Sequence, residues 1–108
     1  MIRYEFEKVV EHDEYLPKPQ DVPEGEIHYC HNYNVISFKC PCGCGEHIFI
    51  NSKGYMPSAT CWDIQLHGDK VTASPSIRMT GGCKSHYFIR VNKVHWCSDS
   101  PVLRKKKS

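Results

Sequence analysis

Five side chains that can bind a metal ion lie in two short segments that are far apart in the sequence. Residues 40–45 read CPCGCG, and residues 83–86 read CKSH. A small tetrahedral metal site needs two such loops, because each supplies part of the ligand set and the ion joins them. The sequence therefore predicts a metal site with ligands from Cys40, Cys42, Cys44, Cys83 and His86.

The residues around these ligands favour metal binding. Gly43 and Gly45 let the backbone turn tightly and direct amide groups at the thiolates, which lowers their pKa and favours metallation. Gly81 and Gly82 give the second segment the same freedom, and His86 follows Cys83 at a spacing that suits one turn around one ion. Three thiolates and one imidazole suit zinc, so we expect a Cys3His-type zinc site.

The sequence leaves the choice of ligands open. The first segment can supply either Cys40 with Cys42 or Cys42 with Cys44. One of Cys40 and Cys44 is then not needed as a ligand. Cys44 and His47 repeat the C-x-x-H spacing, and a Cys2His2 set that includes His47 is therefore an alternative. We interpret the remaining thiols, Cys30, Cys61 and Cys97, as packed or half-exposed residues without a metal.

The chain has seven cysteines, and no apolar leader follows Met1. An odd cysteine count and thiols two residues apart favour metal binding over a disulfide framework. No apolar run reaches the length of a membrane span. We therefore expect a cytoplasmic protein, in a bacterium or in the host cytoplasm if it is phage-encoded.

Charge is unevenly distributed over one predicted domain, residues 1–108. Residues 1–29 carry eight acids and three bases, and they predict a strand followed by an acidic, proline-rich arm. Residues 30–97 form the predicted metal-binding β core. Residues 98–108 end in RKKKS and predict a disordered basic tail, for which nucleic-acid contact is a weaker alternative.

Short runs with period-2 alternation predict an all-β fold. The predicted strands cover residues 2–7, 35–39, 47–50, 62–67, 71–73, 87–91 and 94–96. Asn92 suits a tight hairpin turn, which we expect at Asn92 and Lys93. These elements predict a small antiparallel sandwich or open barrel, zinc-ribbon-like or Rieske-like, with two metal-binding loops projecting from neighbouring hairpins.

The blocks at residues 40–45 and 83–89, with Trp62 and residues 75–77 between them, resemble the bacterial and phage domain of unknown function numbered 6527. Some members of that family lie beside ubiquitin-like conjugation genes. The resemblance implies a phage accessory or bacterial defence role with a protein partner.

A second, distant likeness is to Rieske iron–sulfur domains, which use C-x-H and C-x-x-H on two hairpin loops. Cys83 and His86 fit the second motif, but Cys42 stands where the first motif needs histidine. A 2Fe–2S cluster, and with it a metal-dependent redox protein, is therefore the alternative to zinc.

The sequence favours a non-catalytic, protein-binding zinc module over an enzyme. It contains no Gly-rich phosphate loop and no nucleophile elbow. A nucleobase deaminase is excluded because the P-C-x-x-C spacing fails by one residue and the H-x-E lies in the acidic arm. Residues 75–77 are expected to shape a rim near the metal site and not to act in catalysis.

Overall fold

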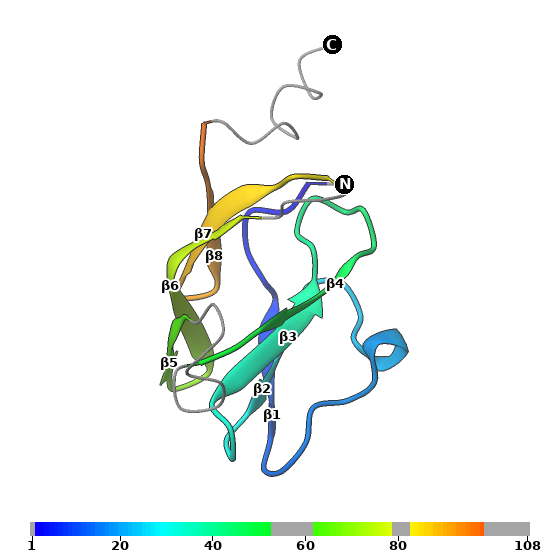
Figure 1. Ribbon diagram of the computed structural model, residues 1–108, viewed down its shortest axis with the longest axis vertical. Helices are drawn as coiled ribbons and strands as arrows, with labels where there is room; N and C mark the ends of the chain where they lie inside the picture. The colour runs from blue at the N-terminus through cyan, green and yellow to red at the C-terminus, as the bar shows by residue number, and fades with distance from the viewer. Residues whose placement is uncertain (1, 53–61, 79–82, 99–108) are drawn as a thin grey trace.

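The computed structural model describes residues 2–52, 62–78 and 83–98, and these residues form two four-stranded sheets (Figure 1). The predicted all-β fold is confirmed. The first sheet has the strand order β1-β2-β3-β4 and the second β5-β6-β7-β8. The strands are β1 (Lys8–His12), β2 (Glu26–Cys30), β3 (Val35–Lys39), β4 (His47–Ile50), β5 (Asp63–His67), β6 (Lys70–Arg78), β7 (His86–Arg90) and β8 (Lys93–Trp96).

The core lies between the two sheets, as in a sandwich. Period-2 alternation places one face of each strand in this core, for example Ile36 and Phe38 from β3 and Tyr87 and Ile89 from β7, all fully buried. Outside the strands, the described residues contain a single 3-10 turn, η1 (Pro19–Asp21). No helical segment among them has the length and apolar character that crossing a membrane requires.

The predicted strand over residues 2–7 was wrong in its position. Within residues 2–7, only Glu5 forms an isolated bridge, to Lys93, and the first full strand begins at Lys8. The segment instead lies along β8, where the Val94 amide donates to Tyr4 O at 2.9 Å, and the Phe6 amide donates to Asn92 O, just before β8, at 2.7 Å. Phe6 is the residue that anchors it, because its side chain is buried in the core whereas Tyr4 is exposed.

The sheets are antiparallel as predicted, except that β1 pairs with β2 in parallel. A parallel pair requires a crossover, and residues 13–25 provide it on the side of the first sheet that faces away from the second (Figure 1). Lys39 Nζ donates to Pro19 O at 3.0 Å, and Val22 is buried. The predicted acidic arm thus covers the outer face of the first sheet and buries His28 and Ser37 there.

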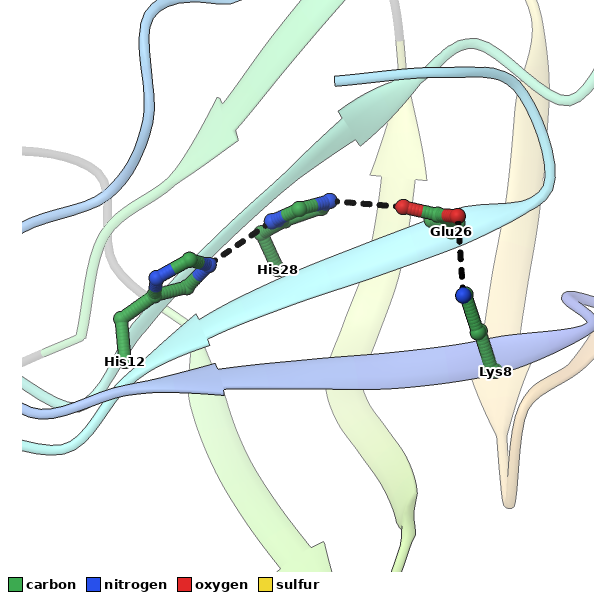
Figure 2. Close-up of polar contacts among 4 residues, drawn as sticks. All are labelled: Lys8, His12, Glu26 and His28. Carbon is green, nitrogen blue, oxygen red and sulfur yellow. Dashed lines mark hydrogen bonds and ion pairs between the residues drawn. The ribbon is translucent and has the colours of Figure 1, made fainter. Parts of the chain in front are cut away.

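A chain of four polar side chains, here called the histidine array, joins β1 to β2 (Figure 2). Lys8 Nζ lies 3.3 Å from Glu26 Oε2, and Glu26 Oε1 lies 3.0 Å from His28 Nε2. His28 Nδ1 then lies 2.8 Å from His12 Nε2. Since a carboxylate only accepts, His28 carries a proton on Nε2, and neutral His28 therefore accepts at Nδ1 from the His12 N–H.

The β7–β8 turn occurs one residue earlier than predicted. Val91 and Asn92, not Asn92 and Lys93, occupy its centre with φ of 50° and 65°. Asn92 suits this conformation, and its Oδ1 accepts a hydrogen bond from the Val71 amide at 2.8 Å. Val91 is β-branched and disfavours positive φ, which is why the sequence did not indicate this turn.

Candidate functional site

The sulfur atoms of four cysteines converge at one end of the molecule. They all lie within 4.8 Å of one another, and they belong to Cys40, Cys42, Cys44 and Cys83. Cys40 Sγ is 3.4 Å from Cys42 Sγ and 3.6 Å from Cys83 Sγ. A tetrahedral zinc site with Zn–S bonds of about 2.3 Å has sulfurs about 3.8 Å apart. The spacing of this four-cysteine cluster therefore fits a metal ion.

Three of the sulfurs come from the loop between β3 and β4. Its Gly43 and Gly45 have φ of 88° and 84°, the left-handed region that favours glycine, as expected for a loop wrapped around its own thiols. The loop is closed by the Cys40 amide, which donates to Glu46 O at 2.8 Å. Cys83 joins from the segment before β7, in which Lys84 also has positive φ.

The pKa values of Cys40, Cys44 and Cys83 are not all shifted in the same direction. Burial raises the pKa of Cys40 and, to a lesser extent, that of Cys44. Burial opposes ionisation of Cys83 too, but hydrogen bonds from Ser85 and the neighbouring thiols outweigh it and lower the pKa of Cys83 to about 7. One thiolate therefore forms readily at neutral pH, and a bound cation would favour loss of the other protons.

Four of the five predicted metal ligands lie in this cluster, whereas His86 lies outside it. His86 Nε2 is 2.9 Å from Ser76 Oγ. His47, the alternative ligand, is on β4 opposite Lys39, and its Nε2 has no hydrogen-bond partner among the described residues. Cys30 is fully buried and donates to Glu14 O, and Cys61 lies outside the described residues.

The contact between Ser76 and His86 joins β6 to β7 next to a β-bulge. The β6–β7 register shifts between Ala73 and Ile77, after which Ile77 pairs with Tyr87 and Arg78 with His86. Ser76 is therefore the diagonal neighbour of His86 on the sheet face that points away from the core. The Ser76 carbonyl accepts a hydrogen bond from Trp62 Nε1 at 3.2 Å.

A serine hydroxyl within hydrogen-bond distance of an imidazole is the arrangement of a nucleophile and its general base. The imidazole accepts at Nε2 when its proton is on Nδ1, and the hydroxyl then donates. Both residues are half-buried and therefore keep some contact with solvent. The sequence predicted only a rim role for residues 75–77, because a Pro-Ser pair ten residues before a histidine carries no recognisable motif.

The two groups of residues are neighbours along the chain. Cys83 lies three residues before His86, and the buried residue Ser85 lies between them. Ser85 Oγ is 3.0 Å from Cys83 Sγ and 3.7 Å from Cys40 Sγ. The chain at the start of β7 thus contributes Cys83 to the candidate metal centre and His86 to the candidate nucleophile–base pair.

Comparison with known proteins identifies the family. No curated protein and no solved structure gives a significant match, but one family profile matches residues 12–97, most of the chain and both of its cysteine segments. This match corrects the predicted family, domain of unknown function 6527, and gives the Rieske likeness no support. The chain belongs to the family described as bacterial ubiquitination-like system serine protease (BubE).

Proposed function

We propose that this protein is a zinc-stabilised serine peptidase of a bacterial ubiquitination-like system. The 2.9 Å contact between Ser76 Oγ and His86 Nε2 carries the proposal, because it pairs a nucleophile with a base in the way the family description leads one to expect. The substrate would then be a protein partner, and its scissile bond would lie over the outer face of β6 and β7.

The proposed reaction is acyl transfer to Ser76. His86 Nε2 takes the hydroxyl proton while Ser76 Oγ bonds to the substrate carbonyl carbon, and His86 then gives that proton to the leaving amine as the C–N bond breaks. Water, deprotonated by the same imidazole, hydrolyses the ester and regenerates the hydroxyl. Trp62 supports this geometry, since its indole N–H holds the Ser76 carbonyl.

The four-cysteine cluster is proposed to bind zinc in a structural role. Four thiolates complete a tetrahedral coordination shell, and this leaves no position for water or substrate. The zinc would therefore fix the loop after β3 to the start of β7 and take no part in the chemistry. Thiols that must remain reduced to bind the metal favour the cytoplasm as the location. The ligands in this proposal are Cys40, Cys42, Cys44 and Cys83.

A fluorophosphonate probe, which reacts covalently with activated serine hydroxyls, tests the proposed nucleophile. We expect the wild-type protein to be labelled, with the adduct located on Ser76 by mass spectrometry. Ser76→Ala should abolish labelling, and His86→Ala should slow it by about 10³-fold or more, because the residues of such a pair act as a unit.

Ser37→Ala provides the control for this experiment. Ser37 is as deeply buried as the core, lies in the other sheet, and its hydroxyl has no hydrogen-bond partner among the described residues. Its substitution should leave labelling unchanged. Labelling that persists in Ser76→Ala, or an adduct on another serine, would refute the assignment.

A further inference from the structure

Ser85 connects the sulfur cluster to the proposed reaction pair. Its side chain is completely buried, and its hydroxyl contacts two sulfurs, 3.0 Å from Cys83 and 3.7 Å from Cys40. A hydroxyl that donates to a thiolate forms a charge-assisted hydrogen bond, which is stronger than a neutral one. The backbone at Ser85 is therefore fixed by contacts of its hydroxyl with the four-cysteine cluster.

The residues after Ser85 alternate in direction. Ser85 and Tyr87 point inward and are fully buried, and His86 between them points to the opposite face, toward Ser76. The carbonyl of His86 accepts a hydrogen bond from the Cys97 amide at 2.9 Å, which ties this residue to the chain after β8. Ser85, the residue before His86, contacts the two sulfurs. The position of the His86 ring therefore depends on both the Cys97 hydrogen bond and the contacts of Ser85.

We propose that Ser85 is a positioning residue for the peptidase proposed above: its hydroxyl, held by the sulfurs of Cys83 and Cys40, fixes the start of β7 so that the His86 imidazole stays within reach of Ser76. This inference rests on the proposed function. A displacement of about 1 Å in a catalytic group can cost about 10²-fold in rate, so a single hydrogen bond at this place has a measurable effect. The four-cysteine cluster then controls reactivity through geometry, without taking part in the reaction.

Ser85→Ala tests the proposal, because it removes the hydroxyl and keeps all four thiols. Ser37→Ala is the matched control, since it removes a hydroxyl that is buried to the same degree in the other sheet. The fluorophosphonate rate per reactive site and the fraction of protein finally labelled are measured separately. We expect Ser85→Ala to react about 10- to 100-fold more slowly, with complete final labelling and unchanged zinc content.

Two outcomes would overturn the proposal. One is a wild-type rate in Ser85→Ala. The other is a smaller labelled fraction that reacts at the wild-type rate, because this pattern means that the hydroxyl only stabilises the fold. Failure of the proposed function has a different result, namely that the wild-type protein is not labelled at Ser76.

Imidazole nitrogen NMR of His86 gives a readout that needs no activity. The Nε2 signal should shift in Ser85→Ala and stay in place in Ser37→Ala. If Ser85→Ala does not fold, the wild-type protein is compared with zinc and with cadmium, a larger ion that spreads the sulfurs. The His86 signal should move with the metal, and a signal that does not move in either comparison overturns the proposal.

Discussion

The four-cysteine cluster joins the two sheets and the histidine array joins β1 to β2, and these two polar groups differ in how their members satisfy one another. In the array, donors and acceptors alternate from Lys8 through Glu26 and His28 to His12. In the cluster, four sulfurs converge, and burial keeps the pKa of Cys40 high while that of Cys83 falls to about 7. The converging sulfurs can all bind one cation, whereas in the histidine array each donor already has an acceptor among the four side chains.

The largest expected effect comes from removing one sulfur of the cluster. Cys83→Ser should release the metal and lower the unfolding free energy by an amount comparable to the whole stability of a small domain, about 5–15 kcal/mol. Elemental analysis and thermal unfolding of protein purified without added metal measure both effects.

Cys30→Ser is the control for this change. Cys30 is a buried thiol outside the cluster, and serine can keep its hydrogen bond to the Glu14 carbonyl. This variant should retain the metal. Full metal content in Cys83→Ser would refute the cluster as a metal site, and iron in place of zinc in the wild-type protein would refute the choice of metal.

The array should show a medium effect on stability and none on metal content. His28→Ala removes the central member, so that His12 loses its partner and Glu26 keeps only Lys8, which should cost about 2 kcal/mol of unfolding free energy in denaturant titrations. Lys8→Ala removes only an exposed ion pair and should cost less than about 0.5 kcal/mol. Equal losses in the two variants would contradict the array as a cooperative chain.

The smallest effect concerns acidification. Burial, and secondarily the nearby His28, lower the pKa of His12 below its ordinary value of 6.5. The unfolded chain therefore binds the proton first, so the stabilisation is fully present above about pH 6.5 and is lost as the pH falls through the lower folded-state pKa. Wild-type protein should lose more unfolding free energy on acidification than His12→Gln.

His47 complicates this measurement, because burial and Lys39 lower its pKa in the same direction. Both proteins contain His47, so the difference between their pH profiles isolates His12. Parallel profiles would show that the histidine array does not respond to pH in this way.

The sequence determined the local elements of the site. Residues 35–39 and 47–50 were predicted as strands with the bounds that the structure has, because alternation and turn residues specify them without help from distant segments. The same holds for the proximity of Cys40, Cys42 and Cys44, since thiols two residues apart in a glycine-containing loop cannot lie far from one another.

Only the tertiary structure decided which distant groups meet. The sequence predicted that both Cys83 and His86 join the first cysteine segment, since both lie in the segment that approaches it, but only Cys83 does so. Strand alternation turned Ser85 toward the sulfurs and His86 away from them, and the pairing of β6 with β7 placed Ser76 beside the imidazole. Register and bulges depend on pairing between remote strands, and a shift of one residue would reverse the face of every side chain in the strand.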